Sequence, residues 1–256
     1  MGNDGVAAVE RALALLDCFR PGEERLALAG FAARVPLHKT TIYRLLNSLV
    51  RAGYVLRQAD GSYSLGPRLL YLGRVYERGF QMSDWVMPRL QALSQQTGET
   101  ASYYVESQGQ RLCLFRVQPR EGLHQHVLAG SLMPFDDSST GQVFSHWGSA
   151  GTHGLGQKAP RLPTFSSGVR DSWTSSLSVP VFGQDDAFVG AMTLSGLSER
   201  LVAARRRFAP LLSAQAESLG AALGASAAHR ARLYGKPAPQ KPRSNPAKKA
   251  PAKAAA

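Results

Sequence analysis

The stretch from Leu37 to Arg51, LHKTTIYRLLNSLVR, decides the fold class of the first part of the chain. At 100° per residue it predicts a helix whose apolar and polar side chains lie on opposite faces. The apolar face consists of Ile42, Leu45, Leu46, Leu49 and Val50, and the polar face of Thr40, Tyr43, Arg44, Asn47 and Arg51. Hydroxyl, phenol, amide and guanidinium groups all hydrogen-bond to base edges or phosphates. The outer face of this helix is therefore a candidate nucleic-acid surface.

The charge around this helix has one sign only. No acidic residue occurs between Arg34 and Arg57, whereas Arg34, Lys39, Arg44, Arg51 and Arg57 are cationic. The alternative interpretation is a plain surface helix without a partner. The solvated face of such a helix normally carries charges of both signs. The uninterrupted positive charge favours DNA as the partner.

The segments around the helix predict a winged helix-turn-helix over residues 1–66. Apolar residues at helical spacing predict a first helix over residues 5–19, and Pro36 separates a short helix over 28–34 from the helix that begins at Leu37. Gly53 ends that helix, and strands over 54–58 and 62–65 flank a tight turn at Asp60-Gly61. Two helices, a turn, a third helix and a hairpin form this fold, with the third helix as the recognition helix.

The rest of the chain predicts an α+β domain over residues 83–232, joined to the winged helix by a linker helix over 67–82. Pro67 suits the first position of that linker helix. The remaining predicted elements are helices over 84–96, 138–147 and 199–228 and strands over 100–106, 111–118, 123–129, 176–182 and 188–195. The segment 148–172 is rich in glycine, proline and serine, which predicts a long loop of low order. The strands pair as antiparallel hairpins, and the fold class of the whole chain is α+β.

Composition limits the partners and the compartment. The chain has 256 residues, 44% of them hydrophobic, and a formal net charge of +12, which indicates a polyanionic partner. A membrane surface is the competing polyanion, but no segment reaches the roughly 20 apolar residues of a membrane span, and Asp4, Glu10 and Asp17 argue against a signal peptide. Cys18 and Cys113 are expected to be reduced and buried, as in a cytoplasmic protein.

Half of the net positive charge lies in the C-terminal segment 233–256. Its six cations, without any acid, are Lys236, Lys241, Arg243, Lys248, Lys249 and Lys253. The segment is also rich in proline and alanine, so disorder is expected. Two interpretations stay open: a sequence-independent DNA tether acting through counterion release, or a solubilising tail.

The chain resembles the IclR family of bacterial transcription regulators over residues 6–228. The resemblance is carried by HKTTIYRLLNSLVRAGYVLR at 38–57, DGSYSLGPRLLYLG at 60–73, TGET at 97–100 and LSG at 194–196. It implies a winged helix followed by an effector-binding domain, assembly into dimers or tetramers, and repression under the control of small organic or aromatic acids.

The resemblance also implies DNA contacts at particular positions. Lys39, Thr40, Thr41, Tyr43 and Arg44 match the family's contact motif, with Tyr43 and Arg44 directed to the major groove and the others to phosphates. Arg57 and Ser62 on the hairpin are expected to contact an adjacent backbone or minor groove. Packing against the hairpin is the alternative role for Tyr43. The chain departs from the family pattern at Pro36 and His38, which affect the turn and not the contact residues.

For the effector site, the resemblance points to a helix start and two late strands. The expected residues are Ser138, Ser139, Thr140 and Gly141 at the helix start and Ser176, Thr193 and Ser195 on the strands. Amides and hydroxyls at a helix N-terminus form a natural carboxylate receptor. The alternative is that these hydroxyls satisfy local backbone groups. The family has a longer helical stretch where this chain has residues 148–172.

The alternatives to a regulator are an enzyme and an architectural DNA-binding protein. For an enzyme, the glycine-rich run GSAGTHGLG at 148–156 lacks the features of a phosphate-binding loop. His124, His126, His146 and His153 have no carboxylate or thiolate partners at metal-ligand spacing, so neither a metal nor another cofactor is expected. The second alternative is a mainly non-specific, architectural DNA-binding protein driven by the basic tail. The sequence favours a sequence-specific regulator that binds operator DNA and acts as a repressor.

Overall fold

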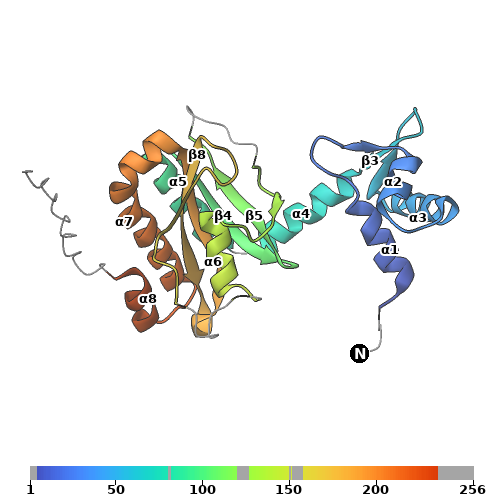
Figure 1. The fold of residues 1–256 in the computed structure, drawn as a ribbon. Coiled ribbons are helices and arrows are strands. Elements are labelled where there is room, and N and C mark those ends of the chain that lie inside the picture. The colour runs from blue at the N-terminus through green and yellow to red at the C-terminus, as the bar shows by residue number, and fades with distance from the viewer. Residues whose placement is uncertain (1–4, 80–81, 120–126, 150, 152–157, 236–256) are drawn as a thin grey trace, which may run out of the picture. The chain divides into compact units, whose positions relative to one another are not determined.

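The structure is a computed structural model that describes residues 5–79, 82–119, 127–149, 151 and 158–235. The chain divides into two compact units, Met1–Ser83 and Asp84–Ala256 (Figure 1). The first holds the predicted winged helix, and the second is built on one antiparallel sheet.

The N-terminal unit is a small helical domain with a three-stranded sheet. Its elements are α1 (Ala7–Leu16), β1 (Arg25–Leu26), α2 (Leu28–Arg34), α3 (Lys39–Arg51), β2 (Val55–Arg57), β3 (Tyr63–Leu65) and α4 (Pro67–Gly79). The predicted helices and hairpin are confirmed, with ends that differ by up to three residues. Strand β1 was not predicted, because two residues carry no periodicity; it pairs with β3 and gives the order β1-β3-β2.

The apolar face predicted for α3 packs into the core of this unit. Ile42, Leu46 and Leu49 are buried, together with Phe31 of α2 and Tyr63 of β3. Gly53 adopts a φ of +77° directly after α3, a conformation that side chains disfavour and that ends the helix. The core thus fixes which face of α3 is turned outward.

The prediction for α1 was wrong about which residues face the core. The helical spacing that predicted this helix is that of Val6, Val9, Leu13 and Leu16. Of these, only Leu16 packs against the core, and the other three are more than half exposed, whereas Leu15 is fully buried. The helix carries apolar residues around much of its circumference, and spacing alone does not distinguish the stripe that packs from the stripe that stays exposed.

The second unit is a six-stranded antiparallel sheet with helices on both faces. Its elements are α5 (Met82–Thr97), β4 (Thr100–Ser107), β5 (Gln110–Val117), β6 (Leu132–Met133), α6 (Ser139–Trp147), β7 (Thr164–Ser167), β8 (Thr174–Phe182), β9 (Phe188–Leu197), α7 (Ser198–Ala222) and α8 (Ala227–Tyr234). The strand order is β6-β5-β4-β9-β8-β7. The predicted α+β class is confirmed.

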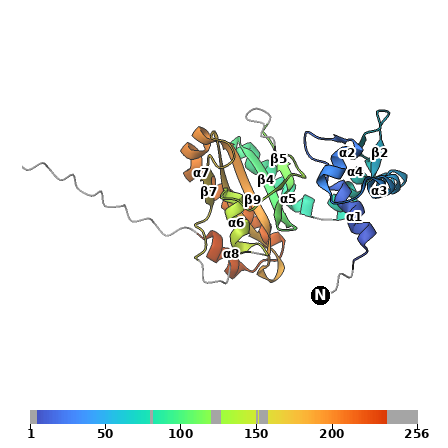
Figure 2. The same cartoon turned by 45° about the vertical axis from the view of Figure 1, so that its right-hand side comes forward.

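Alternation along β8 and β9 separates two layers. Leu177 pairs with Leu194, and Val179 with Met192, on the apolar face that α7 covers. The intervening pair, Ser178 with Thr193, hydrogen-bonds to Thr140 of α6. Helices α6 and α7 lie on opposite faces of the sheet (Figures 1 and 2). Helix α5 lies beside α7, because the Arg89 guanidinium donates to Ser218 Oγ at 3.0 Å. The α6 side is therefore the polar layer.

A predicted strand and a predicted loop of this unit need correction. Residues 123–126 of the predicted strand 123–129 lie outside the described residues, and 127–129 are not a strand, because a turn with Gly130 at φ +90° leads directly into β6. The predicted loop 148–172 contains edge strand β7, which pairs with β8 although its sequence, TFSS, has little apolar character.

The closing helix predicted over 199–228 is divided. Gly224, at φ +89°, ends α7, and the Ser226 hydroxyl caps α8 by accepting from the His229 amide. Helix α8 returns to the sheet, where the Tyr234 hydroxyl donates to the Pro180 carbonyl at 2.5 Å. Residues 233–235, assigned to the tail by sequence, thus include part of this helix, and residues 236–256 lie outside the described part of the chain.

Candidate DNA-binding surface and ligand pocket

The polar face of α3 is turned to solvent. Among the residues predicted to contact DNA, Lys39, Thr40, Tyr43, Arg44, Arg51 and, on β2, Arg57 are exposed, whereas Thr41, Asn47 and Ser62 are half-buried. Leu46 and Ile42 anchor the opposite face of the helix in the core. One rigid element therefore presents two guanidiniums, a phenol and an ammonium on the same outer surface.

Tyr43 and Arg57 connect this helix to the hairpin. The Arg57 guanidinium carbon lies 5.9 Å from the centre of the Tyr43 ring, within cation–π range. Tyr43 is nevertheless 40% exposed. The two roles considered for Tyr43, packing toward the hairpin and contacting DNA, are thus compatible.

The structure divides the cations by role. Arg34 is engaged inside the unit, because its guanidinium donates to Glu23 at 2.8 Å and to the Cys18 carbonyl. In contrast, Lys39, Arg44, Arg51 and Arg57 form no salt bridge with any residue that the structure describes. These four are the charges left available to a polyanion.

Ser62 has a structural role within the hairpin turn. The Asp60 carboxylate accepts from the Ser62 amide at 2.9 Å and from its hydroxyl at 2.6 Å, which fixes the turn at Gly61. Its hydroxyl donor is used locally, so only its acceptor lone pairs could reach a partner.

In the second unit, the predicted effector residues do gather in one place. The hydroxyls of Ser139, Thr140, Ser176 and Thr193 join those of Ser166 and Ser178 in a buried network beneath the first turn of α6. Ser138 is the N-cap, accepting from the Gly141 amide at 3.2 Å. Gly141 allows a close approach, because a Cβ there would lie 2.0 Å from the Asp136 carbonyl oxygen. The alternative, that these hydroxyls satisfy local backbone groups, thus describes Ser138, whereas Ser139, Thr140, Ser176 and Thr193 bond to other hydroxyls.

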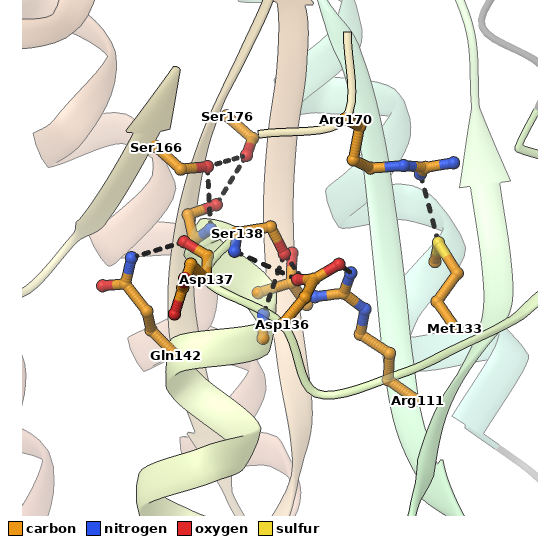
Figure 3. A network of polar contacts seen from close by, with 12 residues as sticks. Arg111, Met133, Asp136, Asp137, Ser138, Gln142, Ser166, Arg170 and Ser176 are labelled. Atoms are coloured by element: carbon orange, nitrogen blue, oxygen red, sulfur yellow. Dashed lines mark hydrogen bonds and ion pairs between the residues drawn. The ribbon is translucent and has the colours of Figure 1, made fainter. Parts of the chain in front are cut away.

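A buried arginine lies beside this helix start. Arg111 of β5 is 1% exposed; its guanidinium donates to the Asp136 carboxylate at 2.8 Å and to the Ser138 hydroxyl. Asp136 also accepts from the Ser138 amide at 3.0 Å. Figure 3 shows Arg111, Asp136 and Ser138 converging at the start of α6. The chain's own carboxylate therefore already lies at the helix N-terminus, where sequence analysis placed the carboxylate of a ligand.

The pair is held in its charged form. Burial opposes ionisation of Asp136, but the hydrogen bonds from Ser138 and the charge of Arg111 outweigh it and keep the pKa of that carboxyl below its ordinary value. Burial lowers the pKa of Arg111, and Asp136 counteracts this effect. Arg111 and Asp136 thus form an ion pair, and Arg111 lines a cavity.

That cavity has a volume of about 370 Å³. Its lining includes four predicted residues, Ser138, Thr140, Ser176 and Ser195, whereas Ser139, Gly141 and Thr193 are not part of it. Two arginines that sequence analysis missed, Arg111 and Arg170, also line it. Arg111 could have been found, since it shares the strand face of Cys113, and a cation on a buried strand face requires a partner.

The cysteines, histidines and helices bear on the predictions of redox state, metal binding and membrane association. Cys18 and Cys113 are free and buried, as predicted. His146 is buried against Trp147, and His124, His126 and His153 lie outside the described residues. The described segments contain no group of three or more potential metal ligands. No helix within them is long and apolar enough to cross a lipid bilayer.

The fold and this surface define a winged-helix DNA-binding regulator with a second, cavity-bearing α+β unit. The IclR helix-turn-helix domain model matches residues 8–59. The glycerol operon regulatory protein of Streptomyces coelicolor is 25% identical over 77% of this chain and 87% of its own length. The DNA-binding transcriptional repressor YiaJ of Escherichia coli is 27% identical over 56% of this chain and 52% of its own length.

Solved structures share the fold. An IclR-type regulator from Silicibacter sp. TM1040 superposes with a TM-score of 0.73 at 23% identity, covering 86% of this chain and 97% of that one. An IclR homologue from Microbacterium hydrocarbonoxydans, solved in complex with 4-hydroxybenzoate, gives 0.68 at 17% identity, covering 85% and 99%. Residues 8–59 thus match an IclR helix-turn-helix domain, and the chain is similar over most of its length to DNA-binding transcription regulators of this type.

Proposed function

We propose that this regulator is a cytoplasmic repressor that binds an inverted-repeat operator as a dimer or tetramer, under the control of a small organic acid. The observation that carries the DNA-binding part is the outer face of α3, where Lys39, Arg44 and Arg51 stand exposed and without ion-pair partners among the described residues. Repression is supported by the family resemblance and by the name of the similar Escherichia coli repressor.

The residues of α3 divide into two roles in this proposal. Arg44 and Tyr43 contact base edges in the major groove, because they lie at the centre of the exposed face. Lys39, Thr40 and Thr41, at the start of the helix, bind phosphates, where unpaired backbone amides add to the attraction. Asn47 and Arg51 extend this surface along the helix, and Arg57 extends it onto the hairpin.

Exposed apolar side chains in the N-terminal unit support assembly into oligomers. Helix α1 exposes Val6, Val9 and Leu13, and α4 exposes Leu70 and Tyr71, each by more than half. Apolar side chains gathered on helices in this way are typical of surfaces that another chain covers. Two recognition helices in such a dimer would bind half-sites separated by about one or more helical turns.

The cavity supports control by a ligand. It is lined by hydroxyls and two guanidiniums beside the apolar side chains of Val127 and Met133, a composition suited to a small organic acid. The similar structure that contains 4-hydroxybenzoate makes aromatic acids the first class to test. Such a ligand can shift DNA binding only if it favours one arrangement of the two units over another.

The competing proposal is a non-specific DNA-binding protein driven by the basic tail, and deletion of residues 235–256 separates the two. Without six cations, affinity for random DNA should fall and depend less steeply on salt. The ratio of operator to random-DNA affinity should change less than about threefold, because base contacts reside on α3. Binding titrations with operator and random DNA at matched salt would measure both affinities. Little operator preference in the intact protein, together with loss of binding on deletion, would support the architectural alternative.

A further inference from the structure

The two ends of the cavity differ in the hydrogen bonds that they can offer. Six hydroxyls lie at one end, and the described hydrogen bonds among them join Thr140 with Ser178 and Thr193 in a closed ring of 2.9–3.0 Å contacts. A chain of contacts then runs outward from Ser178 through Ser139 and Ser176 to Ser166, at 2.8, 2.7 and 3.0 Å.

Counting hydrogens fixes the direction of the three hydrogen bonds outside the ring. Each hydroxyl has one hydrogen to donate, and the six hydroxyls share six hydrogen bonds. The ring uses the three hydrogens of its own members. Therefore Ser139 donates to Ser178, Ser176 to Ser139, and Ser166 to Ser176.

This end of the cavity is consequently an acceptor. Thr140, Ser166 and Ser176 line the cavity, but their hydrogens are already used inside the network, and only lone pairs remain. A carboxylate is itself only an acceptor, so binding it here would require breaking an internal hydrogen bond. A ligand O–H group can donate to these oxygens without disturbing the network.

The other end of the cavity is a donor. Ser138 Oγ accepts from Gly141 and Arg111, and its hydroxyl hydrogen-bonds to the Asp136 carboxylate, so the donors left at this end belong to the arginines. The Arg111 Nε is buried without a partner among the described residues. Arg170, on the β7–β8 connection, donates at 3.1 Å to the thioether sulfur of Met133, a weak acceptor. No carboxylate among the described residues forms a salt bridge with Arg170, although Asp171 lines the same rim.

We propose that Arg170, beside Arg111, selects a carboxylate and that Ser166 and Ser176 accept a hydroxyl at the far end of the same ligand. In Figure 3, Arg170 lies at the upper right, above Arg111, and Ser166 and Ser176 lie together at the upper left. A hydroxylated carboxylic acid with an apolar body between its two polar groups matches this arrangement. The carboxylate then binds arginines that sequence analysis missed, and the ligand hydroxyl lies at the Ser166 and Ser176 hydroxyls. This inference rests on the proposed control by an organic acid.

Four matched probes test the assignment by calorimetry on the full chain: 4-hydroxybenzoate, its amide 4-hydroxybenzamide, its methyl ether 4-methoxybenzoate, and benzoate. The wild type should bind 4-hydroxybenzoate at least about tenfold more tightly than each of the others, since each lacks one charge-assisted or hydroxyl-donated hydrogen bond. Arg170→Met should remove the preference for the acid over the amide and retain the preference for hydroxyl over methoxy.

Controls separate failure of this inference from failure of the proposed function. Arg206→Met removes an exposed arginine of α7 that does not line the cavity, and should leave all four affinities unchanged. Unchanged thermal unfolding of the Arg170→Met variant would show that its fold is retained. An acid preference that survives in Arg170→Met, or equal binding of the hydroxyl and methoxy acids, would overturn this inference alone. A wild type that binds none of the probes would count against acid control as well.

Discussion

Replacing Arg44 with alanine should weaken binding to the operator by about 1–3 kcal/mol for each half-site, roughly 5- to 150-fold. Arg44 is exposed at the centre of the polar face of α3 and forms no salt bridge among the described residues, so its five donors are available to a guanine edge. A symmetric dimer would lose this contact at both half-sites. Fluorescence anisotropy with operator and random duplexes at matched salt would measure the loss.

Arg44→Lys is the matched control, because it keeps the charge and removes the planar pair of donors. It should bind random DNA as the wild type does and still lose most of the operator preference. If Arg44→Ala weakened operator and random DNA equally, Arg44 would contact a phosphate and not a base.

Asp136→Asn should destabilise the second unit by about 3 kcal/mol, the usual consequence of leaving a buried charge without its partner. The Arg111 side chain is 2% exposed, and Asp136 supplies its carboxylate contact at 2.8 Å. Trp85, Trp147 and Trp173 all lie in this unit, so tryptophan fluorescence during urea unfolding reports on it specifically.

The effect should depend on pH in a defined direction. The pKa of Asp136 is lowered in the folded state, so its contribution is complete above the unfolded-state pKa near 4 and is lost as the pH falls through the folded value. The difference in stability between wild type and Asp136→Asn should therefore shrink below about pH 4.

Neighbouring substitutions control for general charge effects. Asp137→Asn makes the same change in net charge at an exposed position and should have little effect. Arg111→Met combined with Asp136→Asn should recover part of the lost stability, because no unpaired charge remains buried. Equal destabilisation by Asp136→Asn and Asp137→Asn would contradict the importance of the ion pair.

The sequence predicted the DNA-binding unit well because its signals are local. The 3.6-residue periodicity of α3, the stop at Gly53 and the turn at Asp60-Gly61 each depend on a few neighbouring residues. The choice of packed face on α1 depends on which stripe the neighbouring helices cover, and spacing did not reveal that Leu15 packs while Leu13 does not.

The cavity was predicted less completely, because its chemistry depends on pairing across distance. The hydroxyls were correctly predicted to lie near the start of α6. The ion pair at this helix start was missed, because Arg111 lies on a strand 25 residues before Asp136. Arg170 lies in a segment predicted as a loop, so nothing local indicated that β7 and β8 bring it to the cavity. The positions of Arg111 and Arg170 at the cavity therefore depend on long-range strand pairing, which local sequence patterns do not predict.

The most direct test of the central claim is genome-wide footprinting of the purified, full-length protein at moderate ionic strength. The proposed function predicts a small set of protected sites that share an inverted repeat, with half-sites about one or more helical turns apart. Protection spread over the genome without a common motif, or no protection at all, would contradict sequence-specific recognition by the exposed face of α3.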